Sequence, residues 1–219
     1  MRLYLSSFKL GERAPDLVDM VGEGGRIGVV LNSRDTSRGM DGDEDVGADE
    51  EFAALAALGL RPEEVDLREH FGDPDGLRRT VEHLDALLVV GGNSFVLSTA
   101  MVHSGFLRAT DERVRAGDLV YAGYSAGSCL AGPDLRGCHL IDDETEHPVG
   151  YPEAGRFDAL GWIPWRIIPH WRSDHPESED AETASEWLDA SGLSYRVMRD
   201  GEVLVIDGAD RRTFRVQPD

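Results

Sequence analysis

Short apolar runs alternate with longer helix-like segments along the first part of the chain. The runs predict β-strands at residues 2–5, 26–31, 64–67, 85–90 and 118–123. The segments between them predict helices at residues 15–21, 49–60, 74–84, 94–105 and 106–117. The run at residues 86–90 is apolar throughout, which is typical of a parallel strand covered on both faces. This order of elements predicts an α/β fold, a three-layer sandwich with a mostly parallel central sheet.

The pattern changes after about residue 160. A helical segment at residues 176–192 precedes apolar runs that are typical of antiparallel hairpins, with turns at Asp200-Gly201 and around Gly208. The sequence contains no evident linker, internal repeat or domain boundary, so we expect residues 1–219 to form a single α/β domain.

The charge balance is strongly acidic, since 42 Asp and Glu residues against 22 Lys and Arg residues give a formal net charge of −20. An acidic surface repels nucleic acid and anionic membranes, so we expect neither as a partner. No apolar run reaches the roughly 18–20 residues that a spanning helix requires, and the N-terminus lacks a signal-peptide pattern. The two cysteines, Cys129 and Cys138, could form one disulfide bridge, but free thiols in a reducing compartment are the simpler interpretation. We therefore predict a cytoplasmic protein.

An acidic stretch suggests a calcium loop but does not fit one. Asp41, Asp43 and Asp45 have the alternate spacing of a calcium-binding loop. The required glycine follows one position late, and the twelfth position is Phe52 instead of glutamate. The seven histidines show no metal-ligand spacing. We expect no metal and no cofactor.

The strongest chemical signal is the sequence G-Y-S-A-G at residues 123–127. Ser125 lies where a predicted strand passes into the small-residue start of a helix, the context in which G-x-S-x-G forms a nucleophile elbow. A sharp strand-to-helix turn exposes the serine hydroxyl, and the helix start favours developing negative charge. A simple glycine-serine turn is the alternative interpretation, so the assignment of Ser125 as a nucleophile needs a base, an acid and an oxyanion site from elsewhere in the chain.

A second glycine motif, V-V-G-G-N-S-F at residues 89–95, follows a buried strand and precedes a helix. Its backbone N–H groups can face a ligand at the carboxyl edge of the sheet. Gly92 is therefore a candidate oxyanion donor, complementing the N–H of Ala126 just after the serine. The alternative is a turn that requires the backbone freedom of glycine.

A serine nucleophile needs a base and an acid that orients the base. His170 ends an apolar run in W-I-P-W-R-I-I-P-H-W, where a loop at the end of a strand would present its side chain, and His175 is the fallback. Asp200, at the predicted Asp-Gly turn, is the candidate acid, with Asp142 and Asp143 as competitors.

Together the segments V-V-G-G-N-S-F, Y-A-G-Y-S-A-G-S and G-W-I-P-W-R-I-I-P-H-W resemble, in order and spacing, the peptidase E family of serine peptidases. The resemblance runs over nearly the whole chain and implies a fold like that of class I glutamine amidotransferase domains. It implies Ser125 as nucleophile, His170 as general base, and Gly92 and Ala126 as oxyanion donors. The third residue of the triad in this family is a carboxylate near the C-terminal hairpin, usually glutamate, and Asp200 occupies the matching place.

The resemblance also implies hydrolysis of a short peptide, and relatives choose dipeptides with an N-terminal aspartate. An arginine in the helix after the histidine helps relatives to bind that acid, whereas Asp180 is the nearest match here. Arg172 and Arg166 could take its place, so we expect Arg172 and Asn93 as substrate-binding residues.

Three alternatives stay open from the sequence. An α/β-hydrolase esterase would use the same elbow with an acid that precedes His170 in the chain. Amidotransferase chemistry needs a cysteine at position 125, where this chain has serine. A catalytically silent small-molecule binding or regulatory protein could use the same scaffold. We expect a monomer or a homodimer, and the loop at residues 33–50 is long and polar enough to form a lid.

Overall fold

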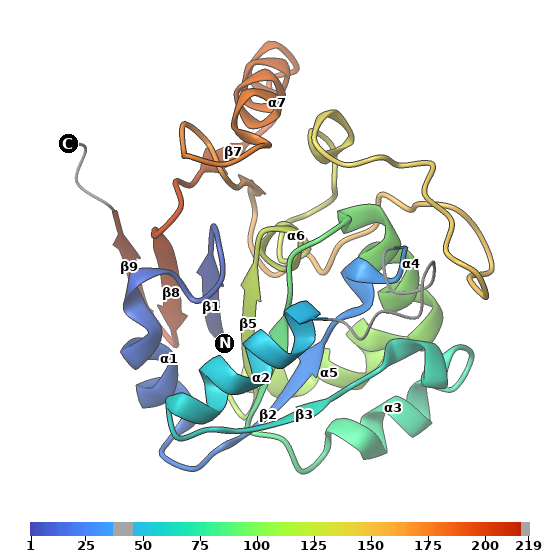
Figure 1. Cartoon of the computed structure of the whole chain (residues 1–219), viewed down its shortest axis with the longest axis vertical. Helices are drawn as coiled ribbons and strands as arrows, with labels where there is room; N and C mark the ends of the chain where they lie inside the picture. The colour runs from blue at the N-terminus through green and yellow to red at the C-terminus, as the bar shows by residue number, and fades with distance from the viewer. Residues whose placement is uncertain (37–45, 216–219) are drawn as a thin grey trace.

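A seven-stranded sheet forms the centre of the protein in a computed structural model that describes residues 1–36 and 46–215 (Figure 1). The strand order is β3-β2-β4-β5-β1-β8-β9. The first five strands in this order are parallel, while β8 runs antiparallel to both β1 and β9. The strands are β1 (Arg2–Ser6), β2 (Arg26–Val30), β3 (Arg61–Glu64), β4 (Ala86–Val89), β5 (Val120–Tyr124), β8 (Val203–Asp207) and β9 (Asp210–Phe214).

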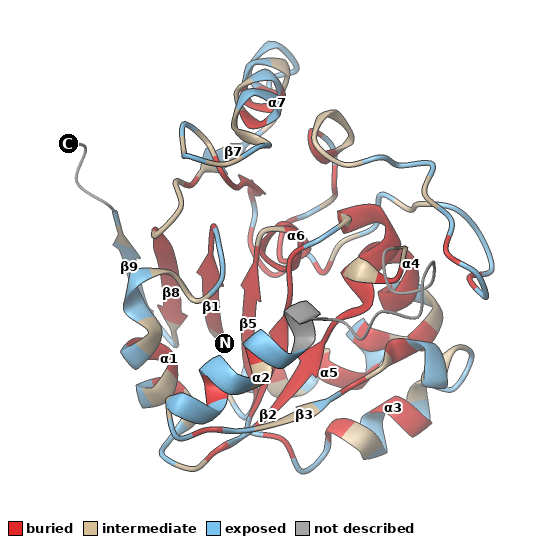
Figure 2. Cartoon of the chain, viewed as in Figure 1, coloured by how far each residue is buried: buried red, intermediate tan, exposed pale blue. Residues whose placement is uncertain are grey.

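Helices cover both faces of this sheet. On one face lie α1 (Ala14–Val21) and α2 (Val46–Ala57), and on the other lie α3 (Pro74–Val81), α4 (Ser94–Ser104) and α5 (Phe106–Ala116). The central strands are buried, whereas much of the outer surface of α2 is exposed (Figure 2). The predicted three-layer α/β sandwich with a mostly parallel sheet is confirmed.

Alternation along each strand divides the apolar side chains between two cores. On β4, Leu87 and Val89 join the core beneath α3, α4 and α5, while Ala86 and Leu88 join the core beneath α1 and α2. Successive side chains of a strand point to opposite faces, so a strand that is apolar throughout serves both layers. Cys129 and Cys138 are buried in the first core as free thiols. No helix among the described residues is long and apolar enough to cross a membrane.

The C-terminal region differs from the sequence prediction at one turn. Strand β7 (Tyr195–Val197) does not form a hairpin with β8, but pairs in parallel with β6 (Arg166–Ile168) in a separate two-stranded sheet. The helix α7 (Ser178–Ala190) packs against this small sheet. The turn at Gly201 does form, with the N–H of Glu202 donating to the carbonyl of Arg199 at 2.9 Å. The hairpin prediction there was wrong because the residues before the turn pair with β6, whereas the β8–β9 hairpin around Gly208 forms as predicted.

Strand β3 begins three residues before the predicted segment at residues 64–67. The apolar residues Val65 and Leu67 suggested the later strand, but they are buried just after β3, and Leu67 lies in a 3₁₀ turn. The apolar signal was correct about burial and misleading about strand pairing.

Two glycines let the polypeptide turn sharply at the end of β5. A side chain at Gly123 would bring its Cβ within 2.5 Å of the carbonyl oxygen of Gly127. A Cβ at Gly127 would collide with the carbonyl oxygen of Val89 on the neighbouring strand β4. The short helix α6 (Ala126–Cys129) therefore lies directly against the sheet, and only glycine allows that approach.

We predict that Gly127→Ala lowers the free energy of unfolding by about 1–3 kcal/mol, because the methyl group meets a backbone atom of a central strand that cannot move aside. Denaturant unfolding of the variant and the unmodified protein measures the loss. The control is Ser191→Ala at the exposed C-terminal end of α7. That variant should change the free energy of unfolding by less than about 0.5 kcal/mol. Equal unfolding free energies for Gly127→Ala and the unmodified protein would contradict the packing argument.

Candidate active site

Ser125 occupies a strained turn between β5 and α6. Its backbone has φ 47° and ψ −118°, a conformation that costs a non-glycine residue about 1–3 kcal/mol. Local hydrogen bonds hold it there: the Ser125 N–H donates to the carbonyl of Ser7 at 3.0 Å. The Ser128 hydroxyl lies 2.8 Å from the carbonyls of both Ser6 and Gly123. This geometry is that of a nucleophile elbow.

Two backbone N–H groups lie close to Ser125 in the fold and are candidates for binding an oxyanion. Neither the N–H of Gly92 nor that of Ala126 donates a hydrogen bond to any residue that the structure describes. Gly92 has φ +144°, and a Cβ there would lie 2.6 Å from the carbonyl oxygen of Ser33. Asn93 fixes this turn by donating its N–H to the same Ser33 carbonyl at 2.9 Å. Both candidate donors therefore belong to backbone segments that are held in place.

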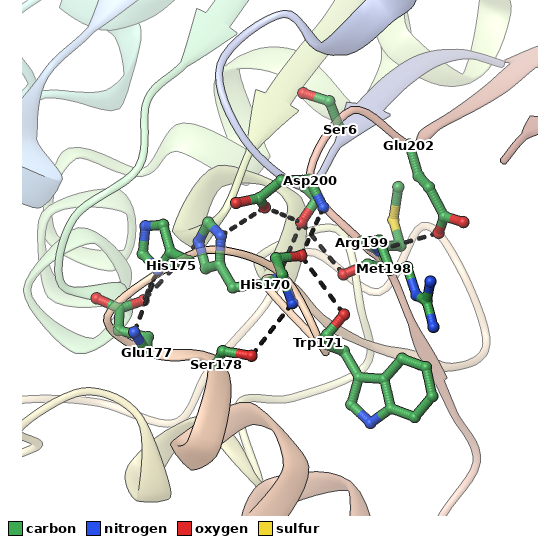
Figure 3. Close-up of polar contacts among 12 residues, drawn as sticks. Ser6, His170, Trp171, His175, Glu177, Ser178, Met198, Arg199, Asp200 and Glu202 are labelled. Carbon is green, nitrogen blue, oxygen red and sulfur yellow. Dashed lines mark hydrogen bonds and ion pairs between the residues drawn. The ribbon is translucent and has the colours of Figure 1, made fainter. Parts of the chain in front are cut away.

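His170 lies between an acid on one side and a second histidine on the other (Figure 3). Its Nδ1 is 2.8 Å from Oδ1 of Asp200, and its side chain is only 2% exposed. The hydroxyl of Ser7 donates to the same Asp200 oxygen at 2.8 Å and accepts the N–H of His170 at 2.9 Å. The contact with Asp200 fixes the proton of the neutral imidazole on Nδ1 and leaves Nε2 free to accept one.

The environment of Asp200 keeps its carboxylate ionised. Burial alone would raise the pKa of Asp200, but the hydrogen bond and charge of His170 and the hydrogen bond from Ser7 lower it below its usual value. A carboxylate with a lowered pKa stays negative at neutral pH, as a group that orients an imidazole must.

Ser125 and His170 both line one pocket of about 180 Å³. The pocket lies where the carboxyl ends of β1, β4 and β5 meet, together with the loop that carries His170. Its other lining residues are Phe8, Lys9, Arg34, Gly91, Gly92, Tyr124, His175 and Glu177. In open parallel sheets this edge is the usual place for a ligand.

The pocket contains two cations that sequence reasoning missed. Arg34 lies after β2 and donates Nε to the carbonyl of Gly91 at 3.2 Å and Nη2 to the phenol of Tyr124 at 2.6 Å. It also pairs with the buried carboxylate of Glu51 at 3.3 Å. Lys9 lies after β1 and pairs with the exposed Glu50. Their positions just beyond strand ends were the signal that could have identified them.

The structure does not bring the expected substrate-binding arginine into the pocket. Arg172 is exposed, and its Cζ lies 4.3 Å from the ring centroid of Trp171. Its Nε lies 3.3 Å from Oε2 of Glu182. Arg166 is buried and pairs with Asp134. These two arginines are already engaged at positions that do not line the Ser125 pocket.

Asn93 and the two competing acids lie at an adjoining cavity of about 320 Å³, which shares Arg34, Gly92 and Glu177 with the first. The side-chain oxygen of Asn93 caps α4, and its Nδ2 donates to the carbonyl of Asp143 at 2.8 Å. Asp142 accepts the N–H of Ser94 at 3.0 Å, and Asp143 accepts the hydroxyl of Thr145 at 2.7 Å. Asp200 is thus the one of the three candidate acids that contacts His170.

His170, His175 and Glu177 bring possible metal ligand atoms within 4.8 Å of one another. The two imidazole rings, however, stack face to face with centroids 3.6 Å apart and an angle of 8°. A metal ion lies near the plane of each imidazole that binds it, and two stacked rings cannot both satisfy that geometry with one ion. We assign no metal to this group. Asp41, Asp43 and Asp45, and much of the loop at residues 33–50, lie outside the described residues.

Residues 41–214 match the sequence profile of peptidase family S51. The chain is 32% identical over 164 residues to peptidase E of Streptomyces coelicolor, which covers 69% of this chain and 63% of the relative. It is 34% identical over 106 residues to peptidase E of Salmonella arizonae, which covers 48% of this chain and 42% of the relative. The chain thus spans less than two thirds of the length of these curated relatives.

Two solved structures share the fold over almost the whole chain. A candidate peptidase E from Listeria monocytogenes superposes with a TM-score of 0.77 at 21% identity, covering 99% of this chain and 98% of the other. A peptidase from an acI-B1 actinobacterium gives a TM-score of 0.69 at 15% identity, covering 99% and 95%. At these identities the likeness establishes the fold.

We predict that Asp142 makes stability depend on pH. Burial, then the nearby Glu177 and Glu146, raise its pKa from 3.8 to about 6 despite its hydrogen bonds with Ser94. A raised pKa means that the folded state binds this proton more tightly, so the stability that it contributes is present at about pH 4 and is lost as the pH rises through about 6.

Asp142→Asn removes this titration while keeping an acceptor for Ser94. Denaturant unfolding should find the variant more stable by about 2–3 kcal/mol at pH 8, and this difference should fall to less than about 1 kcal/mol near pH 4. The control, Asp118→Asn, changes an exposed carboxylate after α5 and should shift stability by less than about 0.5 kcal/mol. A difference for Asp142→Asn that is constant across this pH range would refute the assignment.

Proposed function

The chain belongs to peptidase family S51, as its sequence motifs suggested, and on that premise we propose that it is a serine peptidase that cleaves short peptides through an acyl-enzyme on Ser125. The observation that carries the proposal is the common pocket: a strained Ser125 and His170, whose Nδ1 contacts Asp200, line the same 180 Å³ space. A simple glycine-serine turn requires neither the strain nor a buried, oriented imidazole beside it.

In the first step Ser125 Oγ attacks the carbonyl carbon of the scissile peptide bond while Nε2 of His170 takes the hydroxyl proton. The carbonyl oxygen becomes an oxyanion that accepts hydrogen bonds from the N–H groups of Gly92 and Ala126. His170 then gives the proton to the leaving amine, the C–N bond breaks, and an ester on Ser125 remains. A water molecule repeats the sequence, with His170 as base, and releases the acid product.

Asp200 acts through His170. Its carboxylate holds the Nδ1 proton, so the lone pair of Nε2 faces the pocket, and its negative charge stabilises the imidazolium that forms. Asp200 lies beside the turn at Gly201, and its N–H donates to the hydroxyl of Ser173 at 2.9 Å.

The substrate side chain is the finer part of the proposal. Lys9 and Arg34 line the pocket and supply positive charge for an N-terminal aspartate or for the carboxylate of a dipeptide. Glu177 lines the same pocket and would attract a free ammonium group. A short zwitterionic peptide suits this mixture of charges, and N-terminal aspartate is one candidate within that class.

Two other functions predict different behaviour from the same scaffold. An esterase would hydrolyse activated esters and leave peptide bonds intact, and a silent binding protein would retain ligand affinity without turnover. Membership of a peptidase family supports the peptidase and gives no support to either of these two functions.

We expect turnover in a dipeptide panel with acidic, neutral and basic N-terminal residues, measured by release of free amino acids. Ser125→Ala should abolish this turnover while it retains the fold, because no other group then forms the acyl-enzyme. A preference for Asp-Xaa over neutral dipeptides would support a cationic subsite, and loss of that preference in Lys9→Gln or Arg34→Gln would assign it to that residue. Absence of cleavage across the panel, or cleavage that survives in Ser125→Ala, would refute the proposed function.

Asp200→Asn should lower kcat by about 10³–10⁴-fold with little change in KM, because an amide no longer fixes the tautomer of His170. Asp200→Glu keeps a carboxylate and should recover most of that loss. Asp210→Asn on the exposed strand β9 is the control and should leave kcat unchanged. Equal kcat values for Asp200→Asn and the unmodified enzyme would exclude Asp200 from the triad.

A further inference from the structure

His175 covers one face of the candidate general base. The rings of His170 and His175 are 3.6 Å apart and tilted by only 8°, which is a parallel stack. Phe8 places its ring edgewise to both, with centroid distances of 5.9 Å to His170 and 5.5 Å to His175. His170 therefore contacts two aromatic side chains, Phe8 from the loop after β1 and His175 from its own loop.

The backbone fixes the protonation state of His175. The N–H of Glu177 donates to Nδ1 of His175 at 3.2 Å, so Nδ1 is the acceptor and the ring proton lies on Nε2. Burial, and then the neighbouring His170, lower the pKa of His175 below its usual value of 6.5, although Glu177 and Asp200 oppose the shift. A neutral ring thus faces the base at neutral pH.

A neutral stacked ring has two effects on an imidazole that accepts protons. It blocks rotation of the His170 ring away from the orientation set by Asp200. It also presents a π face to the imidazolium that forms when Ser125 loses its proton, a contact that favours a cation. The carboxylate of Glu177, 3.8 Å from Nε2 of His170, is too distant for a hydrogen bond but adds attraction to the same cation.

We propose that His175 is a positioning residue for the general base, which acts by stacking its neutral ring on His170. It does not itself exchange protons with the substrate. The inference rests on the proposed function, since it assigns a role to His175 in the activation of Ser125. It also gives a place to the histidine that the sequence suggested only as a fallback base.

Two substitutions at position 175 test separately the stacked ring of His175 and the hydrogen bond that its Nδ1 accepts. His175→Asn keeps an acceptor for the N–H of Glu177 but removes the stacked ring. His175→Phe keeps a flat ring but removes the acceptor. The exposed His83 contacts Glu63 and does not line the pocket, so His83→Asn provides the control. Thermal unfolding of each variant establishes that it is folded.

The rate of labelling by a fluorophosphonate probe reports activation of Ser125 without dependence on peptide specificity. We expect His175→Asn to label about 3- to 10-fold more slowly than the unmodified protein, the range for losing one aromatic contact. His175→Phe should recover most of the rate, and His83→Asn should label normally. With dipeptide substrate the loss should fall on kcat and leave KM nearly unchanged.

Normal labelling of His175→Asn would overturn the proposal, and so would a His175→Phe variant as slow as His175→Asn, since the acceptor would then matter instead of the ring.

Equal labelling of Ser125→Ala and the unmodified protein would refute the nucleophile and hence the proposed function. In that case proton NMR decides on the positioning role alone. The Nδ1–H resonance of His170, identified by its loss in Asp200→Asn, should stay sharp in His175→Phe and broaden in His175→Asn. An unchanged resonance in His175→Asn would overturn the positioning role.

Discussion

The close approach of α6 to the central sheet is the constraint on which the candidate site depends. Gly123 and Gly127 leave no room for a Cβ, and the hydroxyl of Ser128 ties the turn to β1 and β5. With these contacts in place, the strained conformation of Ser125 is over-determined by its surroundings and persists. The parallel register of β1, β4 and β5 then brings their loops together at one edge of the sheet.

The second half of the site comes from a different part of the fold. Pairing of β6 with β7 continues beyond the strands, where the N–H of Trp171 donates to the carbonyl of Met198 at 3.1 Å. This pairing aligns the segment that ends in His170 with the segment that leads to Asp200. The contact of His170 with Asp200 is thus a consequence of strand pairing, and Ser7 connects both residues to the main sheet.

Sequence patterns predicted the layers of the fold because apolar alternation and glycine turns are local signals. They also identified Ser125, His170 and Asp200 as candidate site residues, since each lies in or at the end of a recognisable sequence motif. The catalytic roles of these three residues stay predictions. The pairing of β6 with β7 could not be predicted, because strands of three residues carry too little periodicity. The pocket cations Arg34 and Lys9 were missed because surface charges are common, and only the assembled sheet shows which of them meet. The stack of His175 on His170 likewise depends on the loop conformation, which includes left-handed backbone at His170 and Arg172.

Ser125 and His170 are attached to regions with different amounts of buried apolar packing. The elements on either side of Ser125 lie in the two large cores. Helix α7 is buried instead in a small cluster formed by Ile168, Ala181, Ala184 and Leu188, although Ile167 of β6 reaches one of the large cores. Regions with fewer buried apolar contacts open at lower free energy than the whole domain. Partial opening of this cluster would move His170 relative to Ser125 while the central sheet stays folded. Under the proposed function, activity is therefore sensitive to local opening of α7 and the small sheet as well as to unfolding of the whole domain.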